Sequence, residues 1–312
     1  MPSPVTGLHH VTAITGGAQA NVDFYAGRLG LRLVKKTVNF DDPGTYHLYY
    51  ADGDVRPGSV LTFFPWAGAA PARPGPGETT ATAYAVAPDA IAKWQDTFAE
   101  AGEDVGETFE RFGESGLRLR APDGLVVELI ETASADGQWA DGPVPTDKAL
   151  GAFHSVTLCS RAPEATARVL TEAYGYREEG QEDGRIRFVN DAADHARYVD
   201  LSCESVQGAG RQGSGTVHHI AFRVPSDEAE LEVRETLLGM GLQPTPQIDR
   251  QYFHSVYTRE PGGILFEVAT DPPGFATDEA PDELGRALKL PPQYEPRRAA
   301  IEARLAPLTL PY

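Results

Sequence analysis

The sequence predicts an α+β protein built from four βαβββ modules in tandem, which pair into two cup-shaped barrels. Three observations support this prediction. Short strand-like runs recur along the 312 residues, each is followed by one amphipathic helix pattern, and further strand-like runs with turn signals come after the helix. The first strands begin at residues 7, 80, 151 and 215. Because one such module cannot cover its own sheet face, the modules must pair.

The helix patterns place apolar residues at helical spacing, as Ile91, Trp94 and Phe98 show. Pro163 and Ser226 are residue types that favour helix starts. A glycine stands where a left-handed residue would end each helix. The predicted helices span residues 18–30, 89–102, 163–175 and 226–241, and the four glycines are Gly30, Gly102, Gly175 and Gly239.

Strand–turn–strand patterns follow the helices. In the first module, residues 45–52 and 59–66 are strand-like, and Pro122-Asp123-Gly124 and Pro261-Gly262-Gly263 mark hairpin turns in the second and fourth. A Gly- and Pro-rich stretch at 133–150 separates the two halves of the chain. We therefore expect two domains of two modules each, residues 1–140 and 141–312, the second with a C-terminal helical tail.

The composition excludes several classes of protein. A formal net charge of -18 argues against nucleic acid or an anionic membrane as a partner, because phosphate binding needs Lys and Arg. No apolar run is long enough to span a membrane, and the first residues do not resemble a signal peptide. Cys159 and Cys203 lie in no metal-type spacing. We therefore expect no disulfide framework, and we expect a reducing, cytoplasmic environment.

Paired histidines begin two distant strands. In the repeat, His10 aligns with Ser155 and with His219, and the hairpins align Glu128 with Glu267. Since successive strand residues face opposite sides, one histidine of each pair should enter the cup, and His10 and His219 are the better candidates. Two histidines and one carboxylate suit a six-coordinate metal with open positions, typical of Fe(II) oxygenases, with Mn(II) as a plausible substitute.

A structural interpretation competes with the metal. Strand histidines can be satisfied by the backbone, and a buried glutamate can pair with an arginine. Glu128 could belong to a degenerate second metal site, or it could form a structural ion pair. We treat His47 as structural.

The motifs "LHHVT", "HHIAF" and "PGGILFE" resemble the vicinal oxygen chelate superfamily, which has a glyoxalase-like fold. The segments 46–52, 252–267 and 274–279 are similar to its hydroquinone-type ring-cleaving dioxygenases, the branch of 2,6-dichlorohydroquinone 1,2-dioxygenase and the MhqO-like proteins. The resemblance covers most of the chain. It implies Fe(II) held by His10, His219 and Glu267.

The same resemblance implies roles around the metal. His9 resembles a histidine that lies behind the metal ligands in that branch. Tyr257 and Arg250 resemble its active-site tyrosine and arginine. His9 or Tyr257 could move a substrate proton, and Arg250 could stabilise a negatively charged oxygen. Where relatives have an acidic residue, this chain has His254, which leaves the substrate preference open.

The expected activity is therefore extradiol-type cleavage of a hydroquinone by O2, in a cytoplasmic enzyme that could form homo-oligomers. Two alternatives remain on the same fold, a metal-dependent isomerase or lyase and a small-molecule binding module. One metal can contact all three ligands only if module 1 pairs with module 4. We therefore predict the pairings 1–4 and 2–3 rather than 1–2 and 3–4.

Overall fold

A computed structural model describes residues 3–204, 206 and 208–312. Each module has the predicted order of one strand, one helix and three strands. Module 1 contains β1 (Leu8–Thr15), α1 (Ala18–Val22), β2 (Arg32–Val38), β3 (Tyr46–Ala51) and β4 (Val60–Pro65). Module 2 contains β5 (Glu78–Val86), α2 (Ala90–Glu100), β6 (Glu107–Arg111), β7 (Glu114–Arg120) and β8 (Val126–Glu131). Module 3 contains β9 (Phe153–Cys159), α3 (Pro163–Glu172), β10 (Arg177–Glu182), β11 (Arg185–Val189) and β12 (Tyr198–Leu201). Module 4 contains β13 (Val217–Val224), α4 (Asp227–Gly239), β14 (Ile248–Asp249), β15 (Phe253–Arg259) and β16 (Leu265–Pro273), and the tail contains α5 (Arg298–Glu302).

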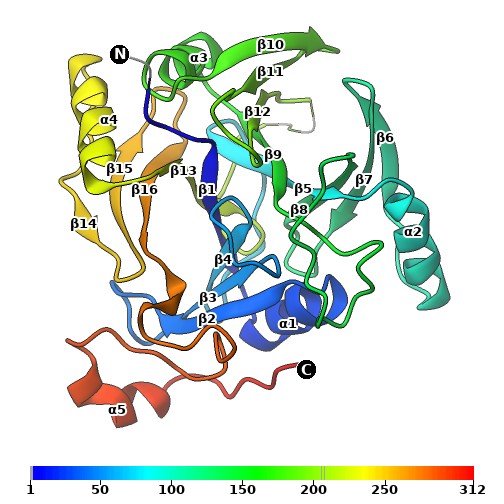
Figure 1. Cartoon of the computed structure of the whole chain (residues 1–312), viewed down its shortest axis with the longest axis vertical. Coiled ribbons are helices and arrows are strands. Elements are labelled where there is room, and N and C mark those ends of the chain that lie inside the picture. Colours follow the sequence, from blue (N-terminus) through cyan, green and yellow to red (C-terminus); the bar gives the residue numbers. More distant parts are fainter. Residues whose placement is uncertain (1–2, 205, 207) are drawn as a thin grey trace.

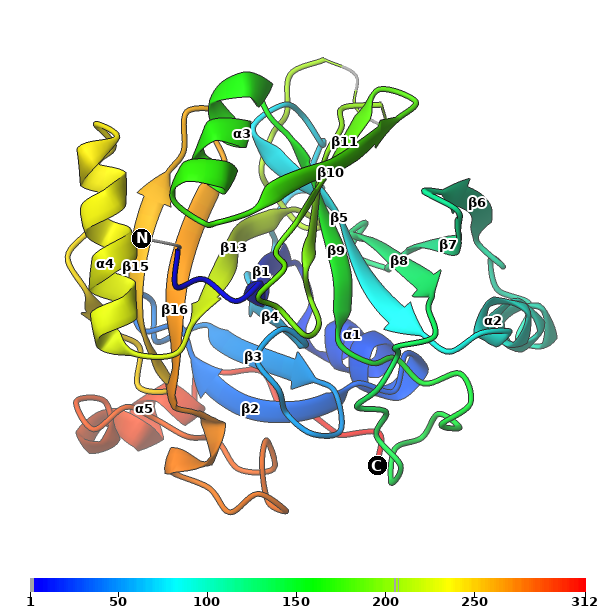
Figure 2. The same cartoon turned by 45° about the horizontal axis from the view of Figure 1, so that its top comes forward.

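The modules pair as predicted, 1 with 4 and 2 with 3. One eight-stranded sheet has the order β14-β15-β16-β13-β1-β4-β3-β2, and the other has the order β10-β11-β12-β9-β5-β8-β7-β6. The two junctions, β1 with β13 and β5 with β9, lie in the middle of the molecule, while α4 and α2 cover opposite outer sides (Figures 1 and 2). The predicted fold class is thus confirmed. Each sheet takes one module from either half of the chain, and the division near residue 140 stays a prediction.

Each junction is an antiparallel pair around an approximate two-fold axis. Val11 lies opposite Ile220, and these two residues also correspond to each other in the repeat. The register of β1 shifts at His9 and that of β13 shifts at His218. Each shift inserts one extra residue, a β-bulge, which turns local side chains out of strict alternation. The first histidine of each pair therefore sits in a bulge.

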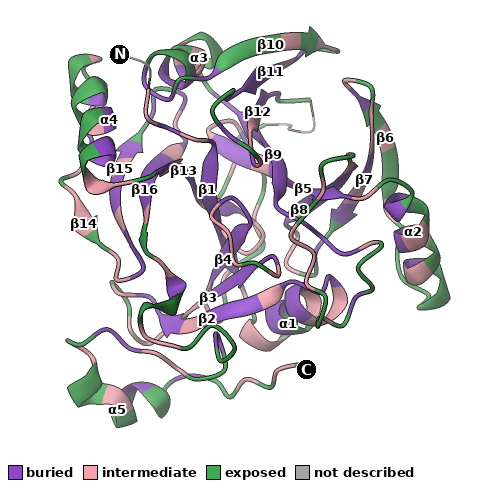
Figure 3. Ribbon diagram, in the orientation of Figure 1, coloured by how far each residue is buried: buried purple, intermediate pink, exposed green. Residues whose placement is uncertain are grey.

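Most strands are buried along most of their length, but the edge strands β6, β10 and β14 are mostly exposed or half-buried. The helices bury one face and expose the other (Figure 3). The predicted first helix is interrupted. Regular α-helix ends at Val22, and a π-helical turn over Asp23–Arg28 follows, closed by a bond from the Leu29 N–H to the Phe24 carbonyl. Gly30, Gly102 and Gly175 have the expected positive φ, but Gly239 does not, because α4 runs through it and Gly241 has the left-handed conformation.

The expectation about the cysteines was wrong. Cys159 and Cys203 form a disulfide across 44 residues of sequence. Cys159 ends β9 and Cys203 follows β12, and these neighbouring parallel strands place Leu158 opposite Leu201. Sheet pairing therefore brings together two cysteines whose sequence spacing carries no signal, and the cysteine argument for a reducing compartment is lost. Among the described residues, no helix combines the length and apolar character needed to cross a membrane.

The tail after β16 lies against β2 and β3 (Figure 1). Lys35 on β2 is fully buried, and its ammonium lies 2.6 Å from an Asp278 carboxylate oxygen and contacts Glu279. The Tyr252 hydroxyl also donates to Asp278, at 3.0 Å. The tail thus connects the edge of module 1 to the hairpin between β14 and β15, and this hairpin carries Arg250.

Candidate metal centre

Three predicted ligands meet at the β1–β13 junction. His10 comes from β1, His219 from β13 and Glu267 from β16, and one donor atom of each lies within 4.8 Å of the others. The two Nε2 atoms are 3.3 Å apart, and Glu267 Oε2 lies 3.3 Å from that of His10 and 2.9 Å from that of His219. The register explains the convergence, because Ala221, two residues beyond His219, lies opposite Glu267 in the parallel pair of β13 and β16.

The preceding histidine orients each imidazole. His9 Nδ1 lies 2.9 Å from His10 Nδ1, and His218 Nδ1 lies 2.8 Å from His219 Nδ1. Each contact occupies one nitrogen of the second ring and leaves its Nε2 facing the centre. Burial lowers the pKa of His9, and a charged His10 would lower it further. Burial followed by the effect of His219 lowers the pKa of His218 to about 4. Both orienting rings are therefore neutral at pH 7, and their Nδ1 can accept a hydrogen bond from the neighbouring ring.

The donor set fits a divalent metal. Glu267 is fully buried, and neither carboxylate oxygen has a hydrogen bond of good geometry, although Oε2 is close to both imidazoles. Burial would raise the pKa of Glu267, but the nearby His10 and His219 lower it well below its ordinary value. Burial lowers the pKa of His219, which favours the neutral imidazole that ligates metals. An ionised, unpartnered carboxylate beside two inward-facing nitrogens is costly in a protein interior unless a cation balances it.

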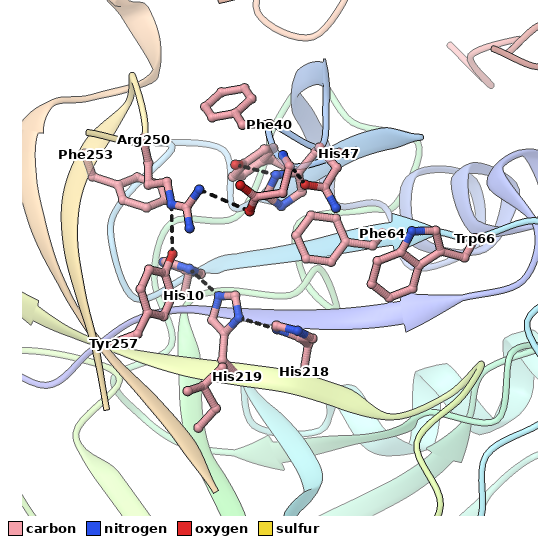
Figure 4. A pocket seen from close by; sticks show the side chains of 14 residues that line it. His10, Phe40, His47, Phe64, Trp66, His218, His219, Arg250, Phe253 and Tyr257 are labelled. Carbon is pink, nitrogen blue, oxygen red and sulfur yellow. Dashed lines mark hydrogen bonds and ion pairs between the residues drawn. The ribbon is translucent and has the colours of Figure 1, made fainter. Parts of the chain in front are cut away.

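A cavity of about 350 Å³ opens onto His10 and His219 (Figure 4). Its walls include the aromatic side chains of Phe40, Phe64, Trp66 and Phe253. An apolar cavity of this size with a few polar groups at its base is typical of a small-molecule site.

Comparison with known proteins identifies the family. MhqO of Bacillus subtilis, provisionally named a ring-cleaving dioxygenase, is 44% identical over 98% of this chain and 98% of its own length. The chlorohydroquinone/hydroquinone 1,2-dioxygenase of Sphingobium indicum is 34% identical over 95% of this chain and 94% of its own. The model of the glyoxalase/bleomycin resistance protein/dioxygenase superfamily matches residues 7–129. The chain belongs to this superfamily.

Solved structures of the superfamily agree. The crystal structure of a Bacillus subtilis protein, provisionally described as a dioxygenase, superimposes with a TM-score of 0.93 at 44% identity and covers 99% of both chains. Glyoxalase I from Zea mays matches with a TM-score of 0.61 at 14% identity over 85% of this chain and 92% of its own, which shows the shared superfamily fold alone.

The two-fold axis relates further residues around the centre of this superfamily member. Glu267 corresponds to Thr62, because Glu267 lies opposite Ala221 and Thr62 lies opposite Thr12, two residues beyond the respective histidines. Tyr257 lies opposite Glu267 on β15 and Tyr49 lies opposite Thr62 on β3, so the two tyrosines also correspond. The symmetry therefore fails at one metal-facing position, where a threonine replaces a carboxylate.

The second sheet has neither histidine at these positions. Ala81 and Ser155 stand where His10 and His219 stand in the first sheet, and Glu128 lies opposite Ala83 as Glu267 lies opposite Ala221. Arg111 Nη1 lies 3.0 Å and Arg118 Nη2 lies 2.9 Å from the Glu128 carboxylate. Of the two interpretations of Glu128, the structural pair therefore describes its contacts.

Asp200 is the fourth residue of this set, and the sequence analysis missed it. It lies opposite Thr157 on β9 and opposite Arg187 on β11. Arg187 Nε donates to its carboxylate at 2.9 Å. In the second sheet, arginines thus stand where tyrosines stand in the first sheet, and they neutralise both carboxylates. A buried carboxylate needs such a partner where no metal balances its charge.

The other predicted residues lie near the centre in different ways. Tyr257 and Arg250 line the cavity, and Arg250 Nε donates to the Tyr257 hydroxyl at 3.2 Å (Figure 4). His9 lies behind His10 and does not line the cavity. His218 does line it, contrary to strict alternation, and it stands at the bulge of β13, where that alternation is broken.

His254 and His47 occupy different places relative to the cavity. His254 points to α4, where its Nδ1 lies 2.6 Å from Asp227, and it does not line the cavity. His47, treated as structural, lines the cavity together with Tyr49. The only sequence signal for His47 and Tyr49 was their position in "YHLYYAD", a segment that resembles the dioxygenase branch.

Proposed function

We propose that this protein is a non-haem Fe(II)-dependent, extradiol-type dioxygenase that cleaves the ring of a hydroquinone with O2, with Mn(II) as a possible substitute metal. The names of the relatives support ring cleavage and a hydroquinone substrate. In this reaction one carbon–carbon bond of the ring breaks, and both atoms of O2 enter the ring-opened acid. We also propose a cytoplasmic location and association into homo-oligomers.

One observation supports dioxygenase chemistry most strongly. Thr62 stands at the two-fold mate of Glu267, so the residues that the structure describes provide two imidazoles and one carboxylate and no fourth ligand of this kind. Such a set leaves positions open for a substrate oxygen and for O2. A closed or nearly closed set would suit a hydrolytic or isomerising Lewis acid instead. The metal-dependent isomerase and the metal-free binding module are therefore less well supported.

The chain's own residues would act as follows. His10, His219 and Glu267 would hold iron, which when bound supplies adjacent open positions and electron transfer between substrate and O2. Burial raises the pKa of Tyr257, as does the carboxylate of Glu267, so its hydroxyl stays protonated and can donate to a phenolate oxygen. Arg250 carries a permanent charge beside this hydroxyl and stabilises negative charge on the same oxygen.

His9 acts through His10 in this proposal. Its Nδ1 accepts from His10 Nδ1, which fixes the tautomer whose Nε2 faces the centre. The aromatic walls hold the ring and exclude water from the reacting oxygens.

The test is oxygen consumption by protein that has been loaded with iron anaerobically. We expect one O2 per molecule of hydroquinone or chlorohydroquinone, and weaker or no consumption with catechol. Robust catechol cleavage without hydroquinone cleavage would place the protein in another extradiol branch. Activity on a hemithioacetal without O2 uptake would instead support the isomerase.

A further inference from the structure

The cavity contains a second polar pair that the proposed mechanism does not use. Tyr49 and His47 both line it, and the Tyr49 hydroxyl lies 2.8 Å from His47 Nδ1. Tyr257, the two-fold mate of Tyr49, has a similar arrangement with Arg250. The cavity thus has two tyrosine hydroxyls, each bonded to a nitrogen-containing side chain.

The two pairs stand on opposite sides of the metal centre. His47 Nε2 lies 2.8 Å from Thr62 Oγ1, which in turn lies 2.8 Å from Thr12 Oγ1. Thr62 is the mate of Glu267 across the axis that passes between His10 and His219. Figure 4 shows the same separation, with Arg250 and Tyr257 on one side and His47 beside Phe64 on the other.

The chemistry of the two sides differs. Arg250 is a cation and suits an anionic oxygen. Burial lowers the pKa of His47, and a charged His10 nearby would lower it further, so the imidazole is neutral. Burial likewise raises the pKa of Tyr49, which keeps its hydroxyl protonated. A neutral phenol that is held by a neutral imidazole is suited to a neutral hydroxyl.

The ring of His47 is fixed on both sides. One nitrogen meets Tyr49 and the other Thr62, while the ring packs on Phe64 at a centroid distance of 4.3 Å. Such a fixed polar group at an aromatic wall costs little entropy when a ligand binds. The pair is therefore preorganised as a recognition site.

We propose that Tyr49 and His47 form the subsite for the second hydroxyl of a para-dihydroxybenzene, the one that does not face Tyr257 and Arg250. This inference rests on the proposed function and names the residues that select the para isomer. The hydroxyls of hydroquinone lie at opposite ends of the ring, so a molecule bound between the two sides would meet both tyrosines. Those of catechol lie on one edge and meet only one side.

The test measures binding rather than turnover. Protein loaded with Zn(II), which has no redox chemistry, is titrated anaerobically with hydroquinone, catechol and phenol in a calorimeter. We expect Tyr49→Phe to weaken hydroquinone binding five- to tenfold, the loss of about one hydrogen bond, and to change phenol and catechol binding less than twofold. The matched control is Tyr46→Phe on the same strand, because the Tyr46 hydroxyl bonds to the Ala306 carbonyl in the tail.

Two outcomes overturn the inference, namely an equal loss of affinity for all three ligands and no loss for any. His47→Asn repeats the test if Tyr49→Phe does not fold, and the same selective loss of hydroquinone affinity is expected. The inference fails separately from the proposed function. Wild-type protein that consumes O2 with hydroquinone, while Tyr49→Phe binds it normally, refutes only the subsite. Iron-loaded wild type without such consumption refutes the function.

Discussion

Replacing Glu267 by glutamine should abolish metal-dependent stabilisation while leaving the fold intact. Glutamine has the same shape but lacks the charge, and the carboxylate it replaces is fully buried without a well-formed hydrogen bond. The two imidazoles stabilise the carboxylate more than burial disfavours it, so the metal-free Glu267→Gln protein should be less stable than wild type but still folded.

The expected stabilisation follows from mass action. A metal at one hundred times its Kd stabilises wild-type protein by about 2.7 kcal/mol. At about 2 °C per kcal/mol for a chain of this size, Tm should rise by about 5 °C. Thermal unfolding with and without Mn(II) measures this rise, and Glu267→Gln should show less than about 1 °C at the same Mn(II) concentration.

The second sheet provides a matched control. Glu128 occupies the equivalent position but pairs with two guanidinium groups. Glu128→Gln leaves these cations with a poorer partner, so it should lower the free energy of unfolding by about 3 kcal/mol and keep the full Mn(II) shift. An undiminished Mn(II) shift in Glu267→Gln would refute the metal assignment, as would loss of the shift in a folded Glu128→Gln.

Two further predictions concern other parts of the chain. Thr62→Glu would place a second carboxylate at the two-fold mate of Glu267, so we expect O2 consumption with hydroquinone to fall at least tenfold while the protein retains Mn(II). Thr62→Val is the control for the lost hydroxyl. Unchanged turnover in Thr62→Glu would contradict the inference that the metal needs open positions. Burial raises the pKa of Glu230 on α4 from 4.5 to about 7. Its contribution to the free energy of unfolding is therefore fully present below pH 4.5 and is lost as the pH rises through 7. Urea unfolding should therefore show Glu230→Gln to be more stable than wild type by roughly 1–2 kcal/mol at pH 8 and nearly equal at pH 5, and equal stability at both would contradict this.

The sequence by itself determined the repeat and the candidate ligand residues. Four strand–helix–strand units are visible in the chain because hydrophobic periodicity and turn residues are local signals. His10, His219 and Glu267 stand at corresponding positions of two units, and a shared metal then requires module 1 to pair with module 4. The observed contact between the two imidazoles agrees with that pairing.

Only the tertiary structure decided what surrounds these ligands. Strict alternation placed His218 outside the cup, but it stands at a bulge, which depends on the partner strand, and it lines the cavity. The disulfide and the pairing of Asp200 with Arg187 depend on which strands become neighbours.

The same reason applies to Tyr49 and His47. Their equivalence to the Tyr257 side is visible only once the register of β3 and β4 is known. Local patterns specify elements and faces, whereas strand register and bulges arise from contacts between residues far apart in the chain.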